Sequence, residues 1–219
     1  MNPFWIFVLS LVPGLAWVYY FYRQDPVLEP VQLIFKVFLF GMLAVFPAGI
    51  IEAPFHMMLS NPTSTFALFL VSFLVVGVVE ESLKFAAAVL AVRHSGEFDQ
   101  VVDGVIYLVT AALGFAAVEN YYYTTAFGIS IAPARAIVAS LAHASFSGVL
   151  GYYWGLGRHS RPFLTVKGWV LAVLLHGLYD FLLLSRIIGT GGAIVGIILL
   201  FLFLRSKLRR AIELTEHGS

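Results

Sequence analysis

The sequence predicts an all-α fold, a polytopic bundle of about seven transmembrane helices. Its 219 residues are 60% hydrophobic and only 11% charged, and the mean hydropathy is +0.92. A chain of this composition has too little polar surface to cover a water-soluble globule. Apolar stretches long enough to cross a bilayer alternate with short breaks that contain proline, glycine or charge. We therefore expect one integral membrane domain over residues 1–219, without an internal repeat.

Each expected span is close to the length of about 20 apolar residues that a helix needs to cross a bilayer. In chain order the spans are Phe4–Tyr22, Leu33–Ile51, Phe66–Val92, Val101–Phe127, Pro133–Gly157, Thr165–Ile187 and Gly189–Leu204. The first lacks a basic leader and a small-residue cleavage site, so we expect a retained helix and not a signal peptide. The last is the shortest, and the basic residues after it are expected to anchor it at anionic lipid.

Lysine and arginine are distributed unevenly between the breaks, which predicts the orientation of the chain. One set of alternate breaks and adjoining helix ends holds Arg23, Lys36, Arg93, Arg158, Arg161, Lys167, Arg205, Lys207, Arg209 and Arg210. The opposite set holds only Arg135 and Arg186, and Lys84 lies inside a span. Because cytoplasmic loops carry the excess of positive charge, we expect the N-terminus outside the cell and the C-terminus in the cytoplasm.

Composition also argues against several classes of function. The net charge is only +1, and no basic run is interleaved with aromatic residues, so nothing indicates nucleic-acid binding. The chain has no cysteine, which excludes disulfides and thiolate nucleophiles. What remains to be explained is a set of polar side chains inside the spans.

These polar side chains lie on four consecutive spans, from the third to the sixth. They are Glu80, Glu81, Lys84, Glu119, Asn120, His143, His176 and Asp180. Counted at about 1.5 Å per residue, their depths overlap between the middle of the bilayer and its outer half. A charged side chain at such depth costs about 2.5–3.5 kcal/mol on insertion scales, so it must be paired, hydrated or used in function. We expect the four spans to enclose one polar pocket.

Spacing within two of the helices supports this interpretation. Glu80 and Lys84 are four residues apart and Glu81 and Lys84 three, so the lysine is predicted to be neutralised by its own helix. His176 and Asp180 are also four residues apart, which lets the carboxylate fix the imidazole ring. Lys84 compensates only about one carboxylate, so pairing alone does not explain the remaining acids and histidines.

Acidic residues near the predicted cytoplasmic face have simpler explanations. Asp103, with Gly104, begins the fourth span, where a carboxylate caps the helix. Asp25 and Glu29 lie in the segment "DPVLEP", which is expected to be a polar loop with proline breaks.

Carboxylates and histidines without a cysteine suit the activation of water, by either of two routes. In the first, a glutamate takes a proton from water and a second acid or imidazole protonates the leaving amine. In the second, zinc is held by two histidines and a carboxylate, with His143, His176, Glu81 and Glu119 as the candidates. The supply of acids and bases on four helices favours the first route, with no cofactor. The sequence contains neither H-E-x-x-H nor G-x-S-x-G.

Three motifs on successive helices resemble those of the PrsW family of intramembrane proteases, which is related to the CAAX-processing proteases. The motifs are Glu80-Glu81-x-x-Lys84, Phe115-x-x-x-Glu119-Asn120 and His176-x-x-x-Asp180, with supporting matches such as "RAIVASLAHASFSGVLGYYWG". The resemblance implies a multi-pass protease of the bacterial plasma membrane that makes the first, site-1 cut in a single-pass anti-sigma factor and so leads to release of a sigma factor. It implies Glu80, Glu81, Glu119, His176 and Asp180 as catalytic residues, with His143 in the pocket.

Two other functions are compatible with buried acids. An ion- or proton-coupled transporter usually shows two related halves, which the unrepeated spans do not support. A non-catalytic membrane scaffold requires that all of the acids be structural.

Overall fold

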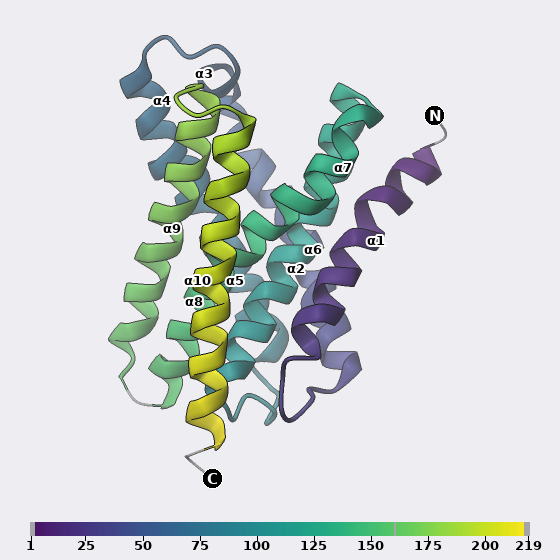
Figure 1. The fold of residues 1–219 in the computed structure, drawn as a ribbon, viewed down its shortest axis with the longest axis vertical. Coiled ribbons are helices and arrows are strands. Elements are labelled where there is room, and N and C mark those ends of the chain that lie inside the picture. Colours follow the sequence, from purple (N-terminus) through teal and green to yellow (C-terminus); the bar gives the residue numbers. More distant parts are fainter. Residues whose placement is uncertain (1–2, 160, 217–219) are drawn as a thin grey trace.

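The computed structural model describes residues 3–159 and 161–216, and all regular elements in these ranges are helical (Figure 1). The long helices are α1 (Pro3–Tyr22), α2 (Val31–Glu52), α5 (Val78–Val92), α6 (Val101–Phe127), α8 (Ser140–His159), α9 (Phe163–Leu184) and α10 (Thr190–Glu216). The short ones are η1 (Ala53–Phe55), α3 (His56–Ser60), α4 (Thr65–Val71), η2 (Ser72–Gly77), η3 (Ile129–Ile131), α7 (Ala132–Ala134) and η4 (Arg135–Ala139). The expected domain over 1–219 also includes residues 1–2, 160 and 217–219, which lie outside this description.

The predicted number of spans is confirmed, because seven helical stretches among the described residues are long and apolar enough to cross a membrane. Three of them are built from several pieces: α2, η1 and α3 form Val31–Ser60, α4, η2 and α5 form Thr65–Val92, and η3 to α8 form Ile129–Arg158. Many large apolar side chains remain exposed on the outside of the bundle. These side chains contact the lipid that surrounds a membrane protein.

The last helix is longer than the sequence predicted. We expected the seventh span to end at Leu204, but α10 continues to Glu216 and carries the following basic residues on the helix. Leu204, Leu208 and Ala211 are almost fully buried against the core. Their spacing of four and three residues forms one apolar stripe, which favours continued helix beyond the bilayer-spanning part.

Helix α6 is the centre of the bundle. It is buried over most of its length and packs against α1, α2 and α8. A Cβ atom on Gly151 of α8 would lie 2.3 Å from the carbonyl oxygen of Gly104 on α6, so only glycine permits this approach of the two backbones. The close contact fixes α8 beside α6, and with it the positions of the polar side chains that both helices carry.

Two π-helical segments precede the helices that carry the central polar residues. Segment η2 leads into α5, and η4 leads into α8. A Cβ atom on Gly77, at the end of η2, would lie 2.9 Å from the carbonyl oxygen of Val173 on α9. The third span therefore lies directly against α9 just before Glu80. Wide π-turns of this kind are frequent at functional sites.

The start of α6 confirms the predicted cap, and the loop before α2 buries its two acidic residues. The Oδ2 atom of Asp103 accepts hydrogen bonds from the backbone N–H groups of Gln100 at 2.6 Å and Asp99 at 3.0 Å. Asp25 and Glu29 lie in the expected loop, but each is only 5% exposed. Burial raises the pKa of Asp25 to about 6 and that of Glu29 to about 7.

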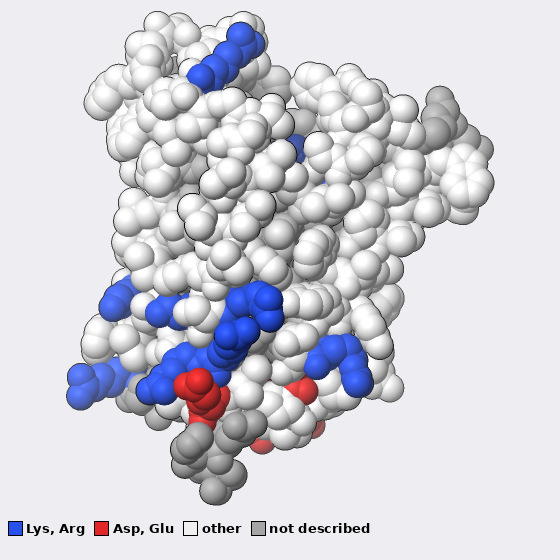
Figure 2. Space-filling view, viewed as in Figure 1, with Lys and Arg blue, Asp and Glu red and all other residues white. Residues whose placement is uncertain are grey.

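Positive charge gathers at one end of the bundle, as the predicted orientation requires. The start of α1 and the end of α10 lie at opposite ends of the bundle (Figure 1). On the face shown in Figure 2, most lysine and arginine side chains surround the end of the bundle at which α10 ends. This distribution agrees with a cytoplasmic C-terminus.

The orientation can be tested with reporters fused at Asn2, which lies outside the described residues, and at the C-terminus. A reporter that is active only outside the cytoplasm should be active at Asn2, and one that is active only in the cytoplasm should be active at the C-terminus. The reason is that the basic end of the bundle stays in the cytoplasm. Cytoplasmic activity at Asn2 would contradict the orientation.

Candidate active site

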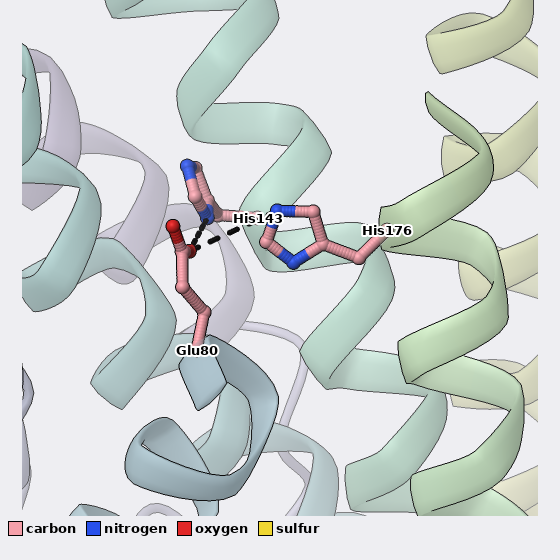
Figure 3. Close-up of side chains that lie close together, drawn as sticks. All are labelled: Glu80, His143 and His176. Carbon is pink, nitrogen blue, oxygen red and sulfur yellow. Dashed lines mark ion pairs between the residues drawn. The ribbon is translucent and has the colours of Figure 1, made fainter. Parts of the chain in front are cut away.

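Glu80, His143 and His176 converge from three different helices, α5, α8 and α9 (Figure 3). The Oε2 atom of Glu80 lies 3.7 Å from Nδ1 of His143 and 3.8 Å from Nε2 of His176. All three side chains are buried. The structure therefore brings together Glu80 and His176, which are 96 positions apart in the sequence.

Lys84 forms the ion pairs that the spacing predicted. Its fully buried Nζ atom lies 2.9 Å from both Glu80 Oε2 and Glu81 Oε1. It also lies 2.8 Å from Nδ1 of His143, a contact between helices that sequence spacing did not predict. The ammonium group thus crosslinks α5 and α8 as well as neutralising its own helix.

Glu81, which is fully buried, orients the His176 ring. Its Oε1 atom lies 2.8 Å from Nδ1 of His176, and its Oε2 atom accepts a hydrogen bond from Ser147 at 2.7 Å. The sequence assigned the orienting role to Asp180, but Asp180 Oδ2 lies 3.5 Å from Nε2, on the other side of the ring. Glu81 therefore occupies the Nδ1 side of the His176 ring, and Nε2 of His176 faces Glu80 and Asp180.

Glu119 plays the matching role for His143. Its Oε2 atom lies 2.8 Å from Nε2 of His143 and 2.9 Å from Nη2 of Arg135. The Nε atom of Arg135 donates to Asn120 at 2.9 Å. In each histidine, the ring nitrogen that faces away from Glu80 (the outer nitrogen) is therefore held by a carboxylate. This leaves His143 Nδ1 and His176 Nε2 facing Glu80.

Sequence analysis missed two charged members of this site. Arg135, at the outer end of the expected fifth span, was used only to predict orientation, although it lies eight residues before His143 and thus about two helical turns away. Glu52 lies one residue beyond the expected end of the second span and was not considered. Its Oε1 atom is buried without a hydrogen-bond partner among the described residues, and its charge interacts with Glu80 and Glu119.

One edge of the site is open. The side chains of Glu119 and Asp180 are 19% and 22% exposed, whereas those of Glu81 and Lys84 are completely buried. Arg135 is also 19% exposed, and its guanidinium group lies 3.9 Å from the centre of the Tyr123 ring. Glu119, Arg135 and Asp180 therefore form the accessible edge of an otherwise buried site.

Comparison with known proteins identifies the family of this chain. Residues 29–206 match the sequence model of the family described as "PrsW family intramembrane metalloprotease". The chain belongs to the PrsW family. It is 33% identical over 183 residues to Protease PrsW of Geobacillus kaustophilus, covering 81% of this chain and 79% of the relative. It is 35% identical over 185 residues to Protease PrsW of Bacillus subtilis, covering 82% and 83%. No solved structure matches the chain.

Membership in the PrsW family decides between the functions that the sequence left open. The protein is a peptidase of a bacterial membrane, with a multi-pass helical fold and a membrane-embedded protein as substrate. We therefore no longer consider the transporter and the non-catalytic scaffold as functions of this protein.

The converging atoms fit the metal that the PrsW family description implies. One ligand atom from each of Glu80, His143 and His176 lies within 4.8 Å of the others, and two histidines with a glutamate are a known catalytic zinc set. A carboxylate on the outer nitrogen of each ring is the usual support for a metal-binding histidine. Of the four ligands proposed from the sequence, Glu81 and Glu119 hold those outer nitrogens, and Glu80 faces the ligand position. A bound ion requires the Lys84 ammonium group to move away from Glu80 and His143.

Replacing Lys84 with alanine should destabilise the protein. The change leaves Glu80 and Glu81 buried without their cation, and breaking a buried ion pair in this way costs about 3–5 kcal/mol. We expect a large loss of folded protein in detergent extracts, measured by size-exclusion chromatography. The exposed Lys167→Ala is the matched control. Unchanged accumulation and an unchanged pH profile of activity in Lys84→Ala would rule out the structural role.

Proposed function

We propose that this PrsW-family protein is an intramembrane endopeptidase that makes the site-1 cut in a single-pass, membrane-anchored anti-sigma factor and so leads to release of a sigma factor. The observation that supports the catalytic part is the convergence of Glu80, His143 and His176, with a second carboxylate on each imidazole. The substrate class is supported by the motif resemblance described above. No cysteine is available for a covalent mechanism with a thiolate.

We further propose that the reaction depends on a divalent metal, zinc being the ion that the donor set suits. Glu80 Oε2, His143 Nδ1 and His176 Nε2 would hold it. When bound, zinc supplies a water of lowered pKa and polarises the peptide carbonyl group. This proposal differs from our expectation from sequence, which favoured direct activation of water by glutamate and histidine. The outer carboxylates on both rings support the metal-dependent route.

The remaining polar groups have separate tasks in peptide hydrolysis. The reaction needs a base for the proton of water, an acid for the leaving amine and positive charge near the developing oxyanion. We assign proton transfer to Asp180, which is partly exposed and 3.5 Å from His176 Nε2. Arg135 supplies positive charge at the open edge. Glu81 and Glu119 keep the imidazole rings in place.

The position of the cut can be predicted from the depth of the site. Counted at about 1.5 Å per residue, the polar groups lie roughly 15 Å below the outer helix ends. A substrate must bring an extended segment with unpaired backbone groups to them, which is easier from the aqueous side than from the middle of the bilayer. We expect cleavage on the extracytoplasmic side of the anti-sigma factor, near its membrane boundary.

Coexpression with a tagged anti-sigma factor tests this function. Mass spectrometry should find products cut near the outer membrane boundary in cells with the wild-type protein, and none in cells with Glu80→Gln. A cut in the cytoplasmic half of the substrate would contradict the proposed geometry. Equal cleavage with both proteins would contradict the proposed site.

A further inference from the structure

We propose that the protein has a second ion site, which binds a hard divalent cation between the loop that joins α1 to α2 and the first turn of α6. The ligands are the carboxylates of Asp25 and Glu29 from the loop and of Asp103 from α6. This site is independent of the proposed proteolytic function. It lies at the end of the bundle where positive charge gathers.

The three carboxylates form a compact and buried group. One oxygen atom from each lies within 4.8 Å of the others. Asp103 is fully buried, and Asp25 and Glu29 are 95% buried, with 5% exposure each. Three acids enclosed together repel one another strongly unless protons or cations compensate their charge.

Two carboxylate oxygens in this group lack a partner, which is a separate observation from the clustering. Asp25 uses Oδ1 to accept a hydrogen bond from the Val27 N–H group at 3.1 Å, and Asp103 uses Oδ2 to cap α6. The Oδ2 atom of Asp25 and the Oδ1 atom of Asp103 are buried without a hydrogen-bond partner among the described residues. Because a buried polar atom without a partner is costly, these two oxygens indicate a ligand from outside the chain.

The described part of the chain does not supply the missing positive charge. None of its lysine, arginine or histidine side chains forms an ion pair with Asp25, Glu29 or Asp103. Lys36 and Arg158 donate instead to backbone carbonyl oxygens. The Tyr107 hydroxyl group donates to Glu29, but it brings no charge. A divalent cation provides both the charge and the partner for the free oxygens.

The chemistry of the ligands indicates the class of ion. A site made of carboxylate oxygens alone suits Ca²⁺ or Mg²⁺, whereas zinc prefers sites with nitrogen or sulfur ligands, such as the histidine-containing active site. The two sites are also separate in space, because Asp103 and Glu119 lie about 24 Å apart along α6 at 1.5 Å per residue. An ion bound here would tie the α1–α2 loop to the central helix.

The test uses the full-length Glu80→Gln variant as parent, which weakens metal binding at the active site. The purified protein in detergent is stripped with chelator and titrated with CaCl₂ and with MgCl₂, by calorimetry and by thermal unfolding. We expect one ion to bind per chain and to raise the melting temperature in a saturable manner. Asp25→Asn should weaken binding by more than about tenfold, the lower bound for loss of a supporting group at a metal site. The matched control Glu97→Gln removes an exposed charge nearby and should bind as the parent does.

The preferred ion is the one that binds more tightly, and either result supports the proposal. It is overturned if neither ion binds the parent, or if Asp25→Asn binds as well as the parent. It is also overturned if acidification alone raises the melting temperature and no ion binds at neutral pH, because protons then compensate the carboxylates. Asp103→Asn should also weaken binding. If loss of the cap prevents this variant from folding, the parent and Asp25→Asn decide the question.

Discussion

Glu80→Ala is expected to abolish proteolysis while the protein stays folded. Glu80 faces the point where His143 Nδ1 and His176 Nε2 converge, and its carboxylate is the group that both ring nitrogens share. Because Glu80 is the proposed carboxylate ligand, its loss would leave the metal poorly held and its water unactivated, and we expect the rate to fall by at least about 10²-fold. Initial rates of cleavage of a single-pass substrate, measured with purified protein, provide the test.

Glu81→Ala should also abolish cleavage, but it should cost stability as well. Glu81 is fully buried and holds Lys84, Ser147 and His176 at once, so its removal leaves three buried polar groups without this partner. Removal of Glu80 leaves the Lys84–Glu81 ion pair in place. Comparing Glu81→Gln with Glu80→Gln separates the two effects, since only the former should lower the melting temperature strongly. Glu213→Gln, at an exposed side chain of α10, is the control. Wild-type turnover in both alanine variants would refute the assignment of the site.

His176→Ala and His143→Ala are expected to remove activity and bound zinc together. Each ring presents one nitrogen to Glu80 and is held on the other by a carboxylate, the arrangement of a supported metal ligand. We expect wild-type protein to carry about one zinc ion per chain, as a catalytic site of this donor set does. Metal analysis of each purified variant should show its loss. The exposed His94→Ala should retain both metal and activity.

A different result would indicate the route without a metal. If His176→Ala loses activity while the wild-type protein contains no stoichiometric metal, glutamate and histidine act on water directly. In that case Lys84 stays between Glu80 and His143, as it does in the structure.

The spans and the pocket could be predicted from the sequence because each depends on local spacing. Hydropathy gave seven spans, since a bilayer needs about 20 apolar residues per helix. The i,i+4 relation between Glu80 and Lys84 predicted their ion pair, which the structure confirms. Overlapping depths predicted that α5, α6, α8 and α9 share one polar region, and Glu119 and His143 do meet there.

The remaining features depend on contacts between different segments of the chain, and residue spacing along a single helix does not predict such contacts. The π-helical segment η4 sets Arg135 beside Glu119, and no helical period predicts that turn. Burial of Asp25 depends on how the α1–α2 loop folds against α6. The extension of α10 depends on a core surface that accepts Leu208.

The most direct test of the central claim is hydrolysis of a single-pass substrate by the purified protein in detergent, before and after exhaustive chelation and again after addition of zinc. The account predicts cleavage near the outer membrane boundary of the substrate, loss of cleavage on chelation and recovery with zinc. It also predicts that Glu80→Gln stays inactive throughout. Undiminished cleavage after chelation would contradict the metal-dependent mechanism, and cleavage by Glu80→Gln would contradict the site itself.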